Sequence, residues 1–245
     1  MSNLEFNSYD NYSPGLDRRS RGSLGDYYYH VEKRKIIEWV DGAGKTLLDV
    51  GTGNGSLLGH LAGGLHLGLG VDLAFDSLRF GSLRYASEEK NIRFALMDAE
   101  KLAVKDDSID VVTAIGTFEG GENIEALFKE INRVLRAGGI FIFTVWNKER
   151  WCRARVLDRK LPGSKEYTRD EVISLTERAG FSISDMCTTF YIPRRLFWFF
   201  YNVLFIEFLR KPYLRLCKKV CLYFLRREKY RMSGWVMLVR AQKIR

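Results

Sequence analysis

The chain has 245 residues, of which 46% are hydrophobic, and its formal net charge at pH 7 is +9. This length and apolar content suit a single domain with a sizeable core. A metal centre is not expected, because no two of the four cysteines form a C-x-x-C pair or adjoin a histidine cluster. Free thiols of a reducing compartment are the better interpretation for Cys152, Cys187, Cys217 and Cys221.

The first 25 residues are polar and rich in Ser, Asn, Gly and Arg. They lack the apolar segment of a signal peptide, so a cytoplasmic location is predicted. Residues 1–25 are predicted to be a flexible segment, and residues 26–245 to form the domain. A helix is predicted over 27–40, with Ile36, Ile37 and Val40 facing inward.

Apolar segments of strand length then alternate with segments of helical periodicity. This alternation predicts a mainly parallel sheet with right-handed crossovers. The predicted helices cover 54–63, 75–89, 122–136 and 169–179, the last beginning at a Thr168/Glu171 capping box. The predicted strands cover 46–50, 66–72, 92–97, 109–115, 140–147, 181–190 and 234–243.

The most informative segment is 47–58, LLDVGTGNGSLL, which predicts a buried strand that turns sharply into a helix. Glycines alternate at Gly51, Gly53 and Gly55, with Asp49 in front of them. A dinucleotide-binding G-x-G-x-x-G loop would need glycine where this chain has Ser56. The pattern resembles motif I of the class I S-adenosylmethionine-dependent methyltransferases.

Acidic residues at the next strand ends extend the resemblance. Asp72 ends the second predicted strand, about 20 residues beyond the glycine loop, where a carboxylate can accept hydrogen bonds from ribose hydroxyls. Asp98 follows the third strand in FALMDAEKLAVKDDSIDVV, which resembles the motif II–III region of the family. The resemblance covers 46–147 and 167–190. It implies a Rossmann-like α/β fold: a seven-stranded, mainly parallel sheet with an antiparallel last strand, between two helical layers.

The resemblance also implies S-adenosylmethionine as cofactor and a role for each matching residue. Asp49 would lie near the methionine ammonium group, Asp72 would hold the ribose, and Asp98 would read the adenine. Turn or cap formation is the alternative role for these three carboxylates. The remaining implied cofactor contacts are Gly51, Thr52, Gly53, Asn54 and Gly55 around the methionine, Ala99 beside the adenine, Ile115 and Gly116 as the floor, and Leu73 and Glu100 without a more specific role.

No catalytic base is assigned. Glu119 follows the fourth strand and could take a proton, but a solvated loop glutamate is at least as good an interpretation. His30 lies on the first helix, where a histidine is more often a surface or packed residue than a base. Aromatic residues that could close over cofactor or acceptor, as substrate or lid residues, are Tyr28, Tyr29, Trp198 and Phe199.

Missing motifs narrow the methyl acceptor. The sequence lacks the Asn/Asp-Pro-Pro-aromatic tetrad of amino-group enzymes, the Pro-Cys context of cytosine enzymes, the double-glutamate loop of arginine enzymes and the acidic cluster of catechol-type enzymes. The remaining acceptors are oxygen, carbon or nitrogen atoms of a small molecule or lipid. The motifs most resemble the ubiquinone/menaquinone-type and general small-molecule branch.

Residues 191–232, between the last two predicted strands, depart from the family. This helical insertion has 11 Lys and Arg residues against two Glu. Its segment 196–209 is apolar nearly all round but, at about 21 Å as a helix, too short to span a bilayer. Pro212 is expected to break the chain. Segment 213–227 predicts an amphipathic helix whose apolar face comprises Leu214, Cys217, Cys221, Phe224 and Leu225.

A basic amphipathic helix beside an aromatic segment is typical of an interfacial membrane anchor, so the insertion predicts binding to an anionic membrane surface and an apolar acceptor. The alternatives are a lid that packs on the protein's own core and an oligomer interface. Nucleic-acid binding, as in an RNA-binding methyltransferase, is less favoured because a continuous apolar block is not its usual surface. A protein that binds S-adenosylmethionine without catalysis is a further alternative.

Overall fold

The computed structural model describes residues 29–41, 43–86, 91–118, 123–151, 165–192, 207–228 and 231–244. The predictions for 1–25, for most of the apolar segment 196–209, and for Tyr28, Glu119, Trp198 and Phe199 lie outside this described part. Only the backbone is described for Tyr29 and His30.

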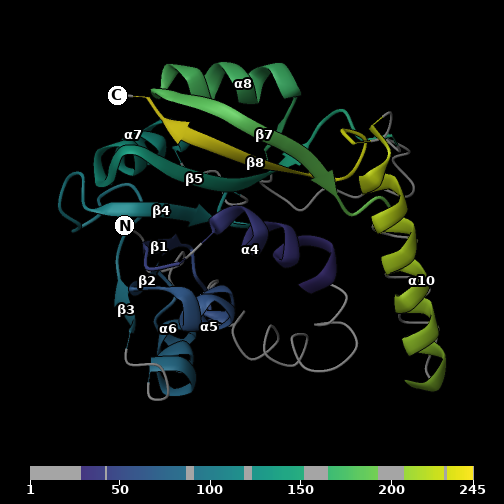
Figure 1. The fold of residues 1–245 in the computed structure, drawn as a ribbon, viewed down its shortest axis with the longest axis horizontal. Helices are drawn as coiled ribbons and strands as arrows, with labels where there is room; N and C mark the ends of the chain where they lie inside the picture. The colour runs from purple at the N-terminus through teal and green to yellow at the C-terminus, as the bar shows by residue number, and fades with distance from the viewer. Residues whose placement is uncertain are drawn as a thin grey trace.

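One sheet runs through the molecule, in the order β3-β2-β1-β4-β5-β8-β7 (Figure 1). Its pairings are parallel except those that β8 makes with β5 and β7. The strands are β1 (Thr46–Val50), β2 (Leu67–Asp72), β3 (Ile92–Leu96), β4 (Ile109–Ala114), β5 (Leu135–Asn147), β6 (Glu166–Tyr167), β7 (Phe181–Thr189) and β8 (Val236–Lys243). The predicted parallel sheet with an antiparallel last strand is confirmed, and the two-residue β6 beside β5 is an addition to it.

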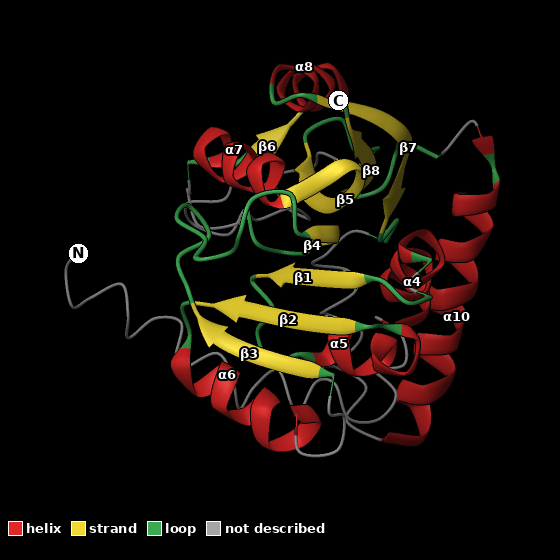
Figure 2. Cartoon of the chain, turned by 60° about the vertical axis from the view of Figure 1, so that its left-hand side comes forward, coloured by secondary structure: helices red, strands yellow, loops and turns green. Residues whose placement is uncertain are grey.

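Helices cover both faces of the sheet and complete three layers (Figure 2). The described helices are α4 (Arg34–Val40), α5 (Ser56–Leu61), α6 (Phe75–Gly81), α7 (Ile124–Val134), α8 (Arg169–Arg178) and α10 (Glu207–Arg226), with short helices η1 (Tyr29–Lys33), η2 (Ala62–Gly64) and η3 (Ser82–Ala86). One hydrophobic cluster joins α4 and α5 to one face, and a larger cluster joins α7 and α8 to the other. The alternation of Val111 and Val112 between these clusters follows from the two-residue period of a strand.

The predicted end of the helix before β5 is wrong by two residues. Gly138 and Gly139 are the glycines expected to end it at residue 136, but α7 ends at Val134. Leu135 has an extended backbone and pairs with Ile109 of β4, so strand pairing ends the helix before the glycines are reached.

The predicted break at Pro212 is also wrong, because α10 runs through this residue. A proline inside a helix removes one backbone N–H, here the one that would bond to the Phe208 carbonyl. Pro212 is the sixth residue of a 20-residue helix, so the loss falls near one end and the helix continues.

The apolar face predicted for segment 213–227 packs against the protein itself. Leu214, Cys217 and Cys221 are buried against Val31 of η1 and Tyr191, which follows β7. The Tyr191 ring stacks on Phe224 with ring centroids 5.3 Å apart. Figures 1 and 2 both place α10 beside α4. This face of α10 therefore packs on the protein itself, as the lid alternative expected.

Candidate cofactor-binding site

The predicted cofactor residues gather where β1, β2 and β4 end. Asp49 of β1 pairs in register with Gly70 of β2 and with Thr113 of β4. Asp72 is the last residue of β2, one step beyond the Val50–Val71 pair. Parallel strands end at one edge of a sheet, so both carboxylates come to the same edge, where ligands of open α/β sheets bind.

Asp49 is a buried carboxylate with two hydroxyl partners. The Thr52 hydroxyl donates to its Oδ2 (2.7 Å), and the Thr113 hydroxyl donates to its Oδ1 (2.6 Å). The side chain is almost inaccessible, with 3% of the residue exposed. Burial raises the pKa of Asp49 to about 6, although both hydroxyl bonds and the nearby Lys33 act in the opposite direction.

Lys33 is a residue of this site that the sequence reasoning missed. Its ammonium group bonds to the Ser56 hydroxyl at the start of α5, and it is near enough to Asp49 for each to shift the other's pKa. Burial lowers the pKa of Lys33 overall. Nothing in the sequence distinguishes Lys33 from other lysines on a helix, because only the packing of η1 brings its side chain to the glycine loop.

The glycine loop needs glycine for two different reasons. Gly51, Gly53 and Gly55 all have positive φ, which L side chains rarely adopt. A Cβ on Gly51 would also lie 2.5 Å from the Thr117 hydroxyl oxygen, and one on Gly55 would lie 2.4 Å from the Phe94 ring. A Cβ on Gly53 would meet nothing within 4 Å, so the middle of the loop faces open space.

Asp72 is tied to this loop. Its Oδ2 accepts the Gly53 N–H (2.7 Å), and its Oδ1 accepts the Ala74 N–H (2.9 Å). Each carboxylate oxygen keeps a second lone pair for another donor. The backbone N–H groups of Gly51 and Thr52 donate to the Val71 carbonyl, so loop and strand end form one rigid unit.

The acidic residues after β3 form a turn. The Asp98 carboxylate accepts the Glu100 N–H (2.9 Å), and the Asp98 carbonyl accepts the Lys101 N–H (3.0 Å). Glu100 accepts the N–H of Asn123, the residue that caps α7 (3.0 Å). Asp98 and Ala99 are half-buried beside the carboxyl end of β2, where the Asp72 carbonyl accepts the Met97 N–H.

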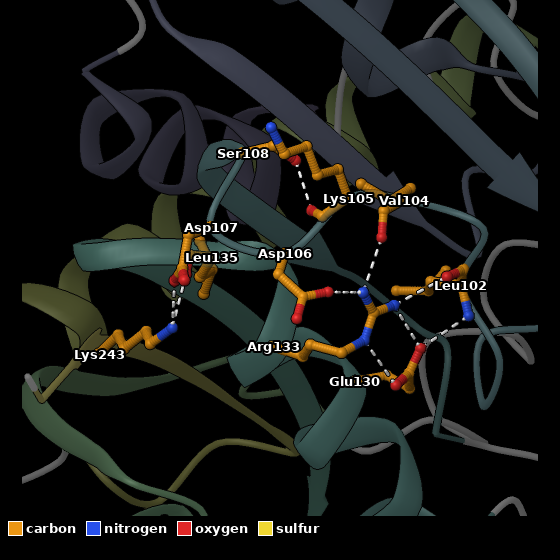
Figure 3. A network of polar contacts seen from close by, with 10 residues as sticks. All are labelled: Leu102, Val104, Lys105, Asp106, Asp107, Ser108, Glu130, Arg133, Leu135 and Lys243. Atoms are coloured by element: carbon orange, nitrogen blue, oxygen red, sulfur yellow. Dashed lines mark hydrogen bonds and ion pairs between the residues drawn. The ribbon is translucent and has the colours of Figure 1, made fainter.

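Arg133 of α7 holds the segment between β3 and β4 in place (Figure 3). Its guanidinium donates to the carbonyls of Leu102 and Val104 and to the carboxylates of Asp106 and Glu130, at 2.5–2.9 Å. The arrangement fixes the path from β3 to β4, which carries Asp98 at its start.

The remaining predicted cofactor residues lie around the same edge. Ile115 is half-buried against the α4–α5 cluster, and the Gly116 N–H donates to the Thr144 hydroxyl of β5 (2.8 Å). Asn54 is buried and its side-chain oxygen accepts the Ser56 N–H, whereas Leu73 is exposed. The chemistry of this set suits a cation-bearing, hydroxyl-bearing ligand, because it offers two carboxylates, an ammonium group and an open glycine loop.

The described ranges show neither a metal centre nor a membrane-spanning helix. There, no three His, Cys, Asp or Glu side chains come close enough together to hold a metal ion. Among the described helices, none is both long and apolar enough to cross a bilayer.

Comparison with known proteins agrees with this geometry. Residues 48–143 match a family described as a methyltransferase domain. The chain is 30% identical over 191 residues to malonyl-(acyl-carrier protein) O-methyltransferase of Geobacter sulfurreducens, covering 68% of this chain and 71% of that protein. It is 28% identical over 174 residues to ubiquinone biosynthesis O-methyltransferase of Paraburkholderia phytofirmans, covering 64% and 75%. It is 31% identical over 133 residues to the malonyl enzyme of a Marinomonas species, where the match covers 53% of this chain and about half (49%) of the relative.

The fold has solved counterparts as well. A SAM-dependent methyltransferase of Aquifex aeolicus superposes with a TM-score of 0.64 at 17% identity, over 96% of this chain and 98% of that one. The chain therefore belongs to the class I S-adenosylmethionine-dependent methyltransferases, as the glycine loop and its acidic partners predicted.

Proposed function

We propose that this methyltransferase modifies a small, lipid-like acceptor at an anionic membrane surface. The unit formed by Asp49, the glycine loop and Asp72 carries the cofactor part of this proposal. The basic, partly apolar outer surface of α10 carries the membrane part.

The open loop and its charged residues fit S-adenosylmethionine group by group. Asp49 would attract the methionine ammonium and Lys33 the methionine carboxylate, at the two sides of one short loop. Asp72 would accept hydrogen bonds from the ribose with the lone pairs that Gly53 and Ala74 leave available. The turn at Asp98 and Ala99 would receive the adenine, with Ile115 and Gly116 beneath it.

The bound cofactor supplies an electrophilic methyl group on a sulfonium. The chain's own contribution is to fix the position of that group and to exclude water, which can provide most of the acceleration of an in-line transfer. The hydrogen bonds from Thr52 and Thr113 hold the Asp49 carboxylate in one orientation before any ligand arrives.

The relatives and the insertion both support the proposed class of acceptor. The relatives named above are O-methyltransferases, one of them acting in ubiquinone biosynthesis. An oxygen atom on an apolar small molecule is therefore the acceptor that we favour. An apolar acceptor would reside in a membrane, where the enzyme would need to meet it.

The outer face of α10 supports contact with a membrane. Leu209, Leu216 and Tyr223 are exposed at intervals of seven residues, so they share one stripe of the helix. Among the exposed basic residues of α10, Lys219 and Arg226 lie beside this stripe, and Lys211 and Arg215 lie farther round the helix. No acidic residue occurs between Phe208 and Arg226. A helix about 30 Å long thus presents a basic, partly apolar face to solvent.

The helix α10 is connected to the proposed cofactor site through η1. The inner face of α10 packs on Val31, and two residues later Lys33 reaches the glycine loop. A membrane bound to the outer face of α10 would therefore be separated from the proposed methionine end of the cofactor by α10 and η1.

A transfer assay tests the proposed reaction. The protein is incubated with methyl-labelled S-adenosylmethionine and a total lipid extract of bacterial membranes. We expect label in an organic-soluble product, and none with the Asp72→Ala variant. Label in neither sample, or equal label in both, would contradict the proposal.

A further inference from the structure

Three buried polar side-chain atoms have no hydrogen-bond partner in the part of the chain that the structure describes. They are the indole Nε1 of Trp146, the hydroxyl of Thr189 and the indole Nε1 of Trp235. A buried donor without a partner is costly, and most such groups in proteins are paired. All three lie where β5, β7 and β8 meet, at the carboxyl ends of β5 and β7.

Two of these atoms belong to one row on one face of the sheet. Val236 of β8 is the register partner of Trp146 in β5 and of Thr189 in β7. Directly opposed residues of antiparallel strands project to the same face, so Trp146 and Thr189 flank Val236 on one side. Two strand spacings, roughly 10 Å, separate their backbones.

This row lies on the α4 side of the sheet. The preceding row on that face contains Leu238 and Cys187, which belong to the same cluster as Ile36 and Trp39 of α4. Trp235 precedes Val236 by one residue, and its ring lies 5.0 Å from the Arg150 guanidinium. By the alternation of a strand, Trp235 faces the other way and is not part of the row.

The row also continues the proposed cofactor site. Thr144 is two residues before Trp146 on β5, so it shares its face, and its hydroxyl accepts the N–H of Gly116. Gly116 is the proposed floor of the cofactor pocket. The two unpartnered groups therefore lie one register step beyond that floor, along the carboxyl edge from β4 toward β7.

We infer that Trp146 and Thr189 bind oxygen atoms of the methyl acceptor, an inference that rests on the proposed function. The indole N–H can only donate, so the acceptor must present an oxygen lone pair to Trp146. The Thr189 hydroxyl can donate or accept, so it can bind a second oxygen as a hydroxyl, carbonyl or carboxylate. The pair fits an oxygenated head group, such as a phenol or a carboxylate, and these residues determine specificity.

Removing the polar atoms while keeping the shapes tests this role. In Trp146→Phe and Thr189→Val, the unliganded protein loses an unpaired donor, so its melting temperature should stay equal or rise. The apparent Michaelis constant for the acceptor, measured by varying the amount of lipid extract in the labelled-methyl assay, should rise at least tenfold. The affinity for S-adenosylmethionine should not change.

Two control variants match these substitutions. Trp235→Phe removes an unpartnered indole nitrogen from the opposite face, so it should leave the Michaelis constant unchanged. Thr176→Val removes a buried hydroxyl that is already bonded to the Val172 carbonyl (2.7 Å), so it should lower the melting temperature without affecting the acceptor.

Each readout can overturn the inference separately. A melting temperature that falls in Thr189→Val as far as in Thr176→Val would mean that water already satisfies the group. A Michaelis constant that changes equally in Trp235→Phe and Trp146→Phe would mean that the effect is structural. If the wild-type protein does not bind S-adenosylmethionine, the proposed function is refuted. The melting temperatures of the variants would still show whether the polar groups of Trp146 and Thr189 are unpaired.

Discussion

At the scale of single residues, Asp49 connects the folding of the site to pH. Its pKa is about 6 in the folded chain and about 4 in an unfolded one. The folded state therefore holds an extra proton between these values, and its stability falls as pH rises from about 4 through 6. A shift of this size corresponds to roughly 3 kcal/mol in the unliganded protein.

If the cofactor binds as proposed, the same carboxyl group should make its affinity depend on pH. A cationic methionine ammonium favours ionised Asp49, so affinity should be about tenfold weaker at pH 5, where most of the carboxyl group is protonated, than near pH 7. Above about pH 8 affinity should fall again, because the ammonium group of the ligand then loses its own proton. Calorimetric titration of S-adenosylmethionine across this range measures the effect.

The Asp49→Asn variant is the control for this prediction. It should bind the cofactor weakly at every pH, without the change near pH 6, and at pH 8 it should be more stable than the wild type when unliganded. A wild-type affinity that is flat between pH 5 and 8 would show that Asp49 does not face the ammonium group.

The sequence alone predicts some residues of the candidate site and not others. The glycine loop, Asp49 and Asp72 could be predicted because their spacing is local and the strand ends place them. Lys33, Thr113 and Thr117 could not, because helix or strand packing brings each of them to the loop from 16 to 67 residues away. The unpartnered atom of Trp146 depends on strand register, which the sequence pattern does not specify.

At the scale of elements, α10 combines two faces with different roles. Its inner face was predicted to be apolar, but the sequence pattern could not decide whether membrane or protein covers it. Packing against η1 and Tyr191 settles that face. The proposed membrane contact is therefore assigned to the outer stripe of Leu209, Leu216 and Tyr223. The sequence analysis did not single out this stripe, because it considered only the periodicity of the inner face.

The outer stripe gives a prediction for vesicle binding. Arg215→Gln with Lys219→Gln should weaken binding to anionic vesicles about thirty-fold, because each basic residue near an anionic surface contributes about 1 kcal/mol. Leu216→Ser with Tyr223→Ser should weaken it by roughly tenfold, through lost apolar burial. Co-sedimentation with phosphatidylserine-containing and phosphatidylcholine vesicles measures both effects.

Substitutions of the same kinds elsewhere on the surface serve as controls. Lys105→Gln with Lys129→Gln removes two exposed charges outside the insertion, and Leu83→Ser removes a leucine that is 70% exposed on η3. Both should bind as the wild type does. Wild-type protein that ignores anionic vesicles, or that binds RNA in their place, would refute the membrane proposal and leave the lid as the role of α10.

At the scale of the whole molecule, charge and chemistry occupy different parts of the chain. The insertion 191–232 holds 11 of the 39 basic residues and two of the 30 acidic ones, so the rest of the chain is balanced at 28 of each. Because it connects β7 to β8, the insertion begins after the carboxyl end of β7 and ends before β8, whose first residue pairs with Trp146 near the carboxyl end of β5. Binding to an anionic surface would therefore orient the whole enzyme, and the effect should weaken as salt rises.

The fold itself was largely predictable, because alternating strands and helices leave few topologies once crossovers are right-handed. The ends of α7 and the continuity of α10 were not, because tertiary pairing at Leu135 and the length of the helix around Pro212 decided them. These differences leave the carboxyl edge intact, so the cofactor site depends on the part of the fold that the sequence specifies best.

The central claim is that the carboxyl edge of β1 and β2 binds S-adenosylmethionine through Asp72. Calorimetric titration of the cofactor into wild type, Asp72→Ala and the nearby control Asp76→Ala tests it most directly. The account predicts saturable binding by the wild type and by Asp76→Ala, with affinity reduced at least hundredfold in Asp72→Ala. Equal affinity in all three proteins, or no binding by the wild type, would contradict it.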